Sequence, residues 1–175
     1  MGIAADLGYA YPRTNVLQRL VRWFASTRVG ARTTPHTLVP LDRLTSRLSR
    51  GRISLPVVLA GLPVLELTTT GRKSGMPRRT HVIAIPFEET LALLGTNFGQ
   101  PATPAWALNL EADPRATVAY HGTTRAVVAR PADDAQRRAI HANAEEAFAG
   151  TAKYEQMVHG RREIRTFVLS DREEP

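Results

Sequence analysis

The chain has 175 residues, 43% of them apolar, which is enough for one compact domain with a buried core. It contains no cysteine, so disulfides, thiolate catalysis and zinc-thiolate sites are excluded. The formal net charge is +7, and the excess lies before residue 63, where nine arginines accompany only Asp6 and Asp42. This basic segment suggests an anionic partner, either lipid headgroups or nucleic acid, and an arginine-rich overall composition explains it equally well.

No segment predicts a transmembrane helix. The longest apolar run, residues 55–65, contains two prolines and a glycine and is shorter than the roughly 20 residues that a spanning helix needs. The N-terminus lacks the pattern of a secretory signal. We therefore expect a cytoplasmic protein.

Two amphipathic helices are predicted within the basic segment. Residues 16–24 place apolar side chains at helical spacing with Arg19 and Arg22 between them, and residues 41–50 repeat this pattern around three leucines. An apolar stripe flanked by arginines suits a helix that lies on an anionic bilayer. We predict residues 1–62 as a basic helical extension packing on residues 63–175, within one structural domain overall. Peripheral contact with the inner face of the cell membrane follows as a hypothesis.

The periodicity changes from Val64 onward, because apolar and polar side chains alternate along residues 65–70 as in a half-buried strand. Five further strands are predicted, at residues 80–85, 91–96, 116–120, 124–129 and 165–169. Short turns at residues 87–90 and 121–123 join two pairs of them as hairpins. Six short, mainly antiparallel strands with few helices predict an α+β fold with a closed or nearly closed barrel, because closure removes exposed edges.

Two helices are predicted between these strands. The first has Thr103 as its N-cap and Pro104 as its first residue, and it ends before residue 114. Its inner face is predicted to carry Trp106, Leu108 and Leu110. The second helix starts at two acidic residues, 133 and 134, and runs to about residue 148.

A basic turn, residues 71–79, follows the first predicted strand. Its two glycines allow backbone N–H groups to face a ligand, and arginine can bind phosphate or carboxylate at two points. The candidate ligand-binding side chains are Arg72, Lys73, Ser74, Arg78 and Arg79. These residues predict an anion site, with a solvated basic hairpin as the alternative.

A second segment, residues 95–106, leaves the end of a strand through glycine and proline and starts a helix, whose N-terminus attracts anions. Trp106 on this helix is either a ligand platform or a core residue. The P-loop pattern Gly-x-x-x-x-Gly-Lys-Ser/Thr is absent from the chain. The five histidines show no metal-ligand spacing, so no metal is assigned.

Together these segments resemble the deazaflavin (F420)-dependent nitroreductase and quinone reductase family. Its members typically read Thr-x-Thr-Gly-Arg-Lys-Ser/Thr-Gly, then Gly-x-Pro-x-x-Pro-x-Trp-x-x-Asn-Leu, then Asn-Pro. Residues 68–75, residues 99–110 and Asp113-Pro114 supply the same order and spacing. The chain departs from the family at Thr103, where His is frequent, and at Asn97, where a basic residue is frequent.

The resemblance implies a split β-barrel that binds coenzyme F420, a deazaflavin hydride carrier with a phosphate and an oligoglutamate tail. It assigns the phosphate or tail to Arg72, Lys73 and Ser74, continued along one strand edge by Arg78, Arg79 and Thr80. The other side of the cofactor cleft would be lined by Thr96, Asn97, Ala105, Trp106 and Asn109. Tyr154 resembles a tyrosine that family members place over the cofactor or substrate, and ordinary packing is the alternative.

The resemblance therefore predicts an F420H2-dependent reductase that transfers a hydride to a small electron-poor acceptor, such as a quinone, nitroaromatic or enone. Such an enzyme needs no protein nucleophile, since the cofactor carries the hydride. FMN is the alternative cofactor, because its phosphate would satisfy the same cations. A non-catalytic carrier of F420, FMN or lipid is the second hypothesis. A nucleic-acid module is the third, and an aromatic content of only 6% argues against it.

Overall fold

The computed structural model describes residues 2–11, 63–147 and 151–172. The chain divides into two compact units, one formed by Met1–Ala10 with Leu65–Pro175 and the other by Tyr11–Val64. The amphipathic helices expected at residues 16–24 and 41–50 lie outside the described residues. The division into residues 1–62 and 63–175 accordingly stays a prediction. Within the described ranges, no helix is both long enough and apolar enough to cross a bilayer.

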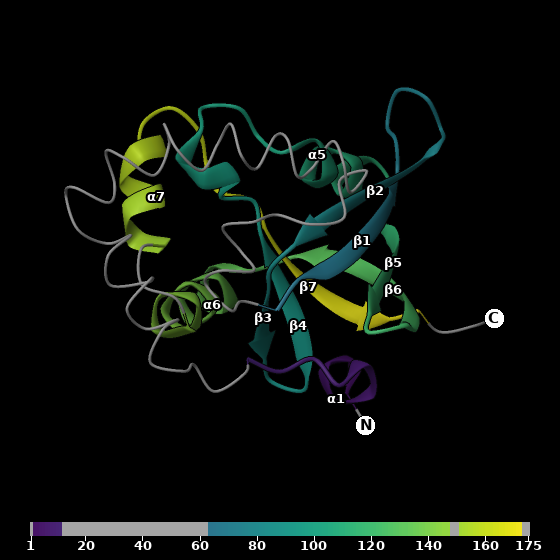
Figure 1. Cartoon of the computed structure of the whole chain (residues 1–175). Coiled ribbons are helices and arrows are strands. Elements are labelled where there is room, and N and C mark those ends of the chain that lie inside the picture. Colours follow the sequence, from purple (N-terminus) through teal and green to yellow (C-terminus); the bar gives the residue numbers. More distant parts are fainter. Residues whose placement is uncertain (1, 12–62, 148–150, 173–175) are drawn as a thin grey trace, which may run out of the picture. The chain divides into compact units, whose positions relative to one another are not determined.

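The first unit is built on one antiparallel sheet of seven strands in the order β2-β1-β5-β6-β7-β4-β3 (Figure 1). The strands are β1 (Leu65–Thr70), β2 (Pro77–Val82), β3 (Ala84–Phe87), β4 (Thr90–Leu94), β5 (Arg115–Tyr120), β6 (Thr123–Pro131) and β7 (Thr166–Asp171). The predicted α+β split-barrel fold is confirmed, with one strand more than expected.

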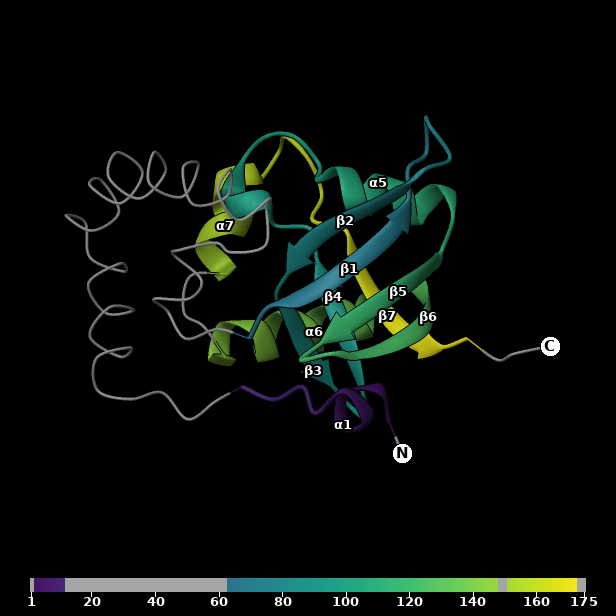
Figure 2. The same ribbon diagram turned by 45° about the vertical axis from the view of Figure 1, so that its right-hand side comes forward.

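The additional strand arises where residues 80–85 were predicted as one continuous strand. The strand is interrupted at Ile83. Val82 ends β2 at one edge of the sheet, and Ala84 begins β3 at the other edge. A one-residue link can join opposite edges only if the sheet curls until they approach each other. The curled sheet is visible in two views (Figure 1, Figure 2). The prediction of a single strand was wrong because a kink between edges has no local sequence signal.

The alternating pattern of β1 is reproduced in its burial. Leu65, Leu67 and Thr69 face the interior, and the residues between them are half-buried. The strands β4 and β7 instead bury consecutive residues, which indicates that both of their faces are covered. The core therefore lies inside the curl and continues beneath the helices that pack outside it.

The β5–β6 hairpin shows why its turn could be predicted. Tyr120 pairs with Thr123, which leaves only His121 and Gly122 in the turn. Both have positive φ, 47° and 89°, as in the two-residue turns that match the twist of antiparallel strands. The predicted turn was one residue too long, since Thr123 is already part of β6.

Helix α5 (Ala105–Ala112) begins one residue later than predicted. Pro104 occupies the N-cap position, and Thr103 makes no capping bond. The predicted inner face is confirmed for Leu110 and wrong for Trp106 and Leu108, which are half-buried, whereas Ala107 and Asn109 are buried. Side chains two positions apart point to different sides of a helix with 3.6 residues per turn.

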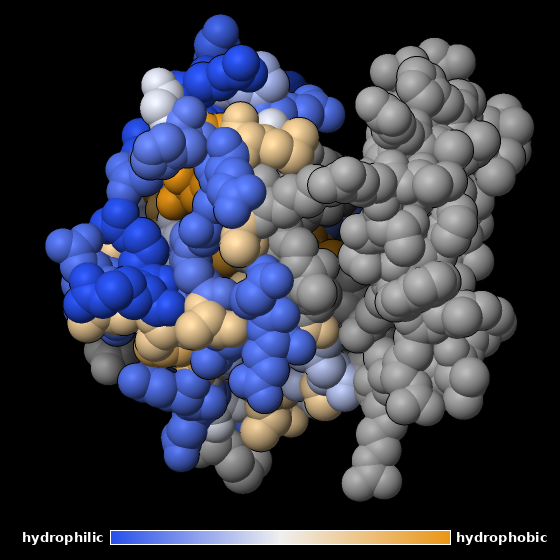
Figure 3. Space-filling view, turned by 90° about the vertical axis from the view of Figure 1, so that its left-hand side faces the viewer, coloured by the Kyte–Doolittle hydropathy of each residue, from blue (hydrophilic) through white to orange (hydrophobic). Residues whose placement is uncertain are grey.

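The other helices are α1 (Ile3–Leu7), the short 3-10 helix η1 (Asn97–Gly99), α6 (Asp134–Ala147) and α7 (Thr151–Val158). Helices α1 and α6 pack against strands, whereas the main contacts of α7 are with α6 and η1. A capping box opens α6, since Asp133 accepts a bond from the Gln136 N–H and Gln136 accepts one from the Asp133 N–H. Figure 3 shows the side of the molecule that carries α6 and α7. Its described residues are mainly hydrophilic, with apolar side chains visible in the recesses between them.

The first residues of the chain belong to the sheet unit. Ile3, Leu7 and Tyr9 are buried, and helix α1 packs against β4, β6 and β7. The Tyr9 hydroxyl donates to the Ala84 carbonyl at 3.0 Å and accepts from the Ala84 N–H at 2.9 Å. It thus binds the peptide that begins β3, directly after the kink at Ile83.

Tyr9→Phe is expected to lower the free energy of unfolding by about 2 kcal/mol, because it removes two buried hydrogen bonds and retains the ring. Urea unfolding of both proteins measures the difference. Tyr120→Phe is the matched control, since the Tyr120 hydroxyl makes no bond to a described residue and its ring packs edge-on against Tyr9. Equal losses in the two variants would contradict the assignment to Ala84.

Candidate cofactor site

The basic turn closes tightly at the end of β1. The Gly71 N–H donates to the Met76 carbonyl at 2.9 Å, and the Gly75 N–H donates to the Gly71 carbonyl at 2.7 Å. A Cβ on Gly71 would lie 2.8 Å from the Ser74 Oγ, and Gly75 has a φ of +66°. Position 75 therefore needs glycine for its conformation, and a side chain at position 71 would crowd the Ser74 hydroxyl. The turn projects beyond the end of the sheet (Figure 1).

The cations of the turn are exposed and available to a ligand. Arg72 and Lys73 form no ion pair with a described residue, and Arg78 donates to the Ser74 Oγ at 3.3 Å. The Arg79 guanidinium lies 3.8 Å from the Glu66 carboxylate, a long distance for an ion pair, and 71% of the Arg79 side chain is exposed. This ion pair is therefore weak. A turn with this much uncompensated charge fits the phosphate and carboxylates of an anionic cofactor.

The strand register separates the predicted cations into two faces. Arg78 pairs with Thr69 and Thr80 with Leu67, so both lie on the face that β1 buries. Arg79 pairs with Thr68 and lies on the opposite face. The structure thus brings Arg78 to the turn, beside Gly71, and directs Arg79 away from it.

Asn109 links helix α5 to the residues where strand β1 meets the basic turn. The residue is buried, with 6% of its surface exposed. The Oδ1 atom accepts from the Arg72 N–H at 3.1 Å, and the Nδ2 atom donates to the Thr69 Oγ1 at 3.0 Å. Both polar groups of Asn109 therefore have protein partners, and the geometry supports a role in positioning the turn.

Asp113 connects the end of α5 to the start of β5. Its carboxylate accepts two bonds from the Arg115 guanidinium, at 2.9 and 3.1 Å, and one from the Arg115 N–H at 3.1 Å. These bonds, with a smaller contribution from the Thr70 hydroxyl, lower the pKa of Asp113 from 3.8 to about 2. The carboxylate stays charged in the folded protein at pH values where it is protonated in the unfolded chain.

Asp113→Asn is expected to lower stability at pH 7 by at most about 1 kcal/mol, since the Arg115 partner is largely exposed. A lowered pKa stabilises the folded state above pH 3.8, and this contribution is lost as the pH falls toward 2. The difference between wild type and variant should therefore be constant from pH 7 to about pH 4 and shrink below that. Thermal unfolding at pH 7, 4 and 3 tests this, and a difference that does not shrink would contradict it.

The second candidate segment follows β4. Asn97 begins η1 with a φ of +47°, and its Nδ2 donates to the Ala102 carbonyl at 2.8 Å. Ala105 is exposed at the start of α5. Trp106 is half-buried and contacts Phe167, with 6.2 Å between ring centroids, so part of its surface serves the core.

Tyr154 lies in α7, and its side chain is outside the part of the chain that the structure describes. The helix itself rests against η1, where the Met157 side chain packs over Gly99. A Cβ on Gly99 would lie 2.8 Å from the Met157 sulfur. Helix α7 therefore borders the segment that carries Asn97.

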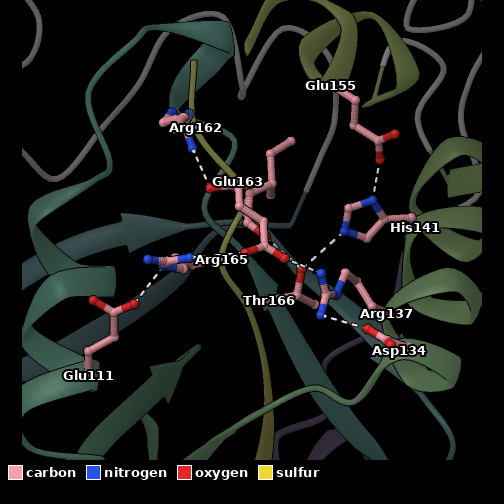
Figure 4. A network of polar contacts seen from close by, with 10 residues as sticks. Glu111, Asp134, Arg137, His141, Glu155, Arg162, Glu163, Arg165 and Thr166 are labelled. Carbon is pink, nitrogen blue, oxygen red and sulfur yellow. Dashed lines mark hydrogen bonds and ion pairs between the residues drawn. The ribbon is translucent and has the colours of Figure 1, made fainter. Parts of the chain in front are cut away.

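A polar network between α5, α6 and β7 was not predicted. Glu163 pairs with Arg137 and Arg165, and Arg165 also approaches Glu111 of α5 (Figure 4). Nearby, His141 of α6 contacts Glu155 of α7 through its Nδ1 atom, and its Nε2 atom lies 3.0 Å from the Thr166 hydroxyl of β7. Isolated charges in a chain rich in arginine carry no signal of their partners, so only the folded structure shows these pairs.

The curled sheet with its cation-rich turn beside α5 defines a split β-barrel protein. The model of the F420H(2)-dependent quinone reductase family matches residues 43–171, and the chain belongs to this family. It is an oxidoreductase that uses coenzyme F420, and the FMN alternative finds no support in this match.

The chain is also similar to several solved structures. An F420-H2 dependent reductase, FDR-A, is 27% identical with a TM-score of 0.56, over 62% of this chain and 94% of the other. A domain-swapped dimer is 25% identical with a TM-score of 0.56, over 75% and 99%. A heme binding protein from Mycobacterium smegmatis, 20% identical with a TM-score of 0.50 over 63% and 47%, shares the fold.

Proposed function

We propose that the protein transfers a hydride from reduced F420 to a small electron-poor acceptor of the quinone, nitroaromatic or enone class. One observation carries the site assignment: the basic turn exposes Arg72 and Lys73 without a described carboxylate partner. The bound cofactor supplies the two-electron chemistry, and the protein orients it and excludes water. Membership of the reductase family supports the reaction type.

The predicted cofactor-binding residues of the basic turn and β2 fall into two groups, those at the turn and those further along the strand. Arg72, Lys73, Ser74 and Arg78 bind the phosphate or the acidic tail, because they share the turn. Arg79 and Thr80 are placed further along β2, and only Thr80 lies on the same face as Arg78.

The other wall of the site follows from the resemblance and from the position of η1. Thr96, Asn97, Ala105 and Trp106 line this wall, and Asn109 holds the turn at its root. Tyr154 contributes from α7, next to the cofactor or the acceptor.

The experiment that tests the function has two steps. The purified protein is titrated with F420 and with FMN in parallel, by fluorescence. Reduced F420 is then supplied with a quinone, a nitroaromatic or an enone at equal concentration, and its oxidation is followed. Preference for FMN, or binding of neither, would overturn the proposal, whereas tight F420 binding without reduction of any acceptor would favour the carrier hypothesis.

We further propose that the arginine-flanked segments at residues 16–24 and 41–50 contact an anionic bilayer, which would bring the enzyme to an apolar acceptor. The charge distribution of the sequence supports this, since nine arginines lie before residue 63. Co-sedimentation with anionic liposomes at low salt is expected. Its failure would remove the membrane contact and leave the reductase function intact.

A further inference from the structure

Arg162 lies between α7 and β7 in the sequence. Its side chain binds residues 95–100, a segment 62 to 67 residues earlier in the chain. Its Nε donates to the Gln100 carbonyl at 3.1 Å, Nη1 to the Gly95 carbonyl at 2.9 Å, and Nη2 to the Thr96 carbonyl at 2.6 Å. The guanidinium is half-buried and forms no ion pair with a described carboxylate. Its hydrogen bonds are therefore used mainly on the backbone of the segment that joins β4 to α5.

These contacts orient the peptides that precede η1. The described residues contain no cis peptide bond, so each amide N–H points opposite to the carbonyl of the preceding residue. Because the carbonyls of Gly95 and Thr96 point to the guanidinium, the N–H groups of Thr96 and Asn97 point away from it. Asn97 has a φ of +47°, a left-handed conformation that is uncommon for residues other than glycine and that asparagine adopts more readily than most.

The segment that carries Arg162 makes further contacts. Its neighbour Glu163 pairs with Arg137 of α6, and the Arg165 side chain approaches Glu111 of α5 (Figure 4). The Arg165 carbonyl also accepts a bond from the Gly95 N–H at 2.8 Å. The segment that carries Arg162 is thus tied to both helices, and it holds Gly95 from two directions.

We propose that Arg162 is a positioning residue of the cofactor site, which holds Thr96 and Asn97 in the conformation that F420 binding requires. This inference rests on the proposed function, in which these two residues line one wall of the site. Arginine is needed because its planar group presents three separate nitrogens to three carbonyls, whereas the single ammonium of lysine cannot replace that arrangement. In this role Arg162 fixes the conformation of Thr96 and Asn97 and does not contact the reacting atoms.

The test compares Arg162→Met and Arg162→Lys with one control variant. Arg161→Met removes one positive charge from the exposed neighbouring residue, whose side chain forms no hydrogen bond with a described residue of the segment 95–100. Amide hydrogen exchange of the cofactor-free protein is measured first. Exchange at residues 95–100 should become faster in both Arg162 variants and stay unchanged in Arg161→Met.

The second measurement is the Kd for F420, followed by kcat and KM with one acceptor. Arg162→Met should weaken F420 binding about tenfold, the effect of one lost charged hydrogen bond. A misplaced wall should lower kcat/KM by up to about 100-fold. Arg162→Lys keeps the charge and should recover only part of the affinity, while Arg161→Met should stay within about twofold of wild type.

The outcomes separate the inference from the function on which it rests. Failure of the wild-type protein to bind F420 would contradict the proposed function. Normal binding and normal exchange in Arg162→Met would contradict this inference alone, and so would an equal loss of affinity in Arg161→Met, which would indicate a charge effect. If Arg162→Met does not fold, Arg162→Lys provides the same comparison, and full affinity in that variant would overturn the need for three contacts.

Discussion

The double variant Arg72→Ala/Lys73→Ala is expected to bind F420 at least about tenfold more weakly than wild type and to remain folded. Loss of one charge-assisted contact of about 1.5 kcal/mol corresponds to roughly this factor. The fold should persist because both side chains are exposed and the turn is closed by backbone bonds of Gly71 and Gly75. Fluorescence titration gives the affinity, and circular dichroism confirms the fold.

A matched variant separates local contact from total charge. Arg130→Ala/Arg138→Ala also removes two exposed arginines that form no ion pair with a described residue, but these lie on β6 and α6. It should bind F420 within about twofold of wild type. Affinity should also fall more steeply with salt in wild type than in the turn variant, since salt screens exposed charges. Unchanged affinity in the turn variant would show that the basic turn is a solvated hairpin.

Asn109→Leu is expected to lower the free energy of unfolding by about 3 kcal/mol and to weaken F420 binding about tenfold. The change leaves the Arg72 N–H and the buried Thr69 hydroxyl without their shared partner, and each unsatisfied group costs about 1 to 3 kcal/mol. The loss of affinity follows because the turn is no longer held at its root. Urea unfolding and cofactor titration measure the two effects.

Thr69→Val serves as the comparison for Asn109→Leu. It removes the bond to Thr69 but keeps the bond between Asn109 and the Arg72 N–H. A smaller loss of stability and a nearly normal affinity are therefore expected. If Thr69→Val and Asn109→Leu weaken binding equally, then the contact with Arg72 does not position the site.

Several elements could be predicted because their signals are local. The alternation along β1, the two acidic residues that open α6 and the His121-Gly122 turn each depend on neighbouring residues. The glycines at positions 71 and 75 likewise indicate a tight turn wherever they occur. Their conformations follow from sterics and hydrogen bonding within a few residues, which the sequence contains in full.

Other features depended on contacts between distant residues. The kink at Ile83 separates β2 from β3 because the sheet curls, and Asn109 faces inward because α5 packs on β1. The family resemblance could indicate Asn109, yet its partners, the Arg72 N–H and Thr69, are 37 and 40 residues away. No periodicity in the sequence encodes such pairs.

The sequence by itself determined the basic turn and its glycines, because their signals are local. The class of cofactor followed from the resemblance of its motifs, in their order and spacing, to those of the reductase family. Only the tertiary structure decided which cations share a face. It placed Arg78 at the turn and turned Arg79 toward Glu66, since strand pairing alternates side chains between two faces. It also placed the Arg162 guanidinium within hydrogen-bonding distance of three carbonyls in residues 95–100. These contacts form because segments that are distant in the sequence pack together.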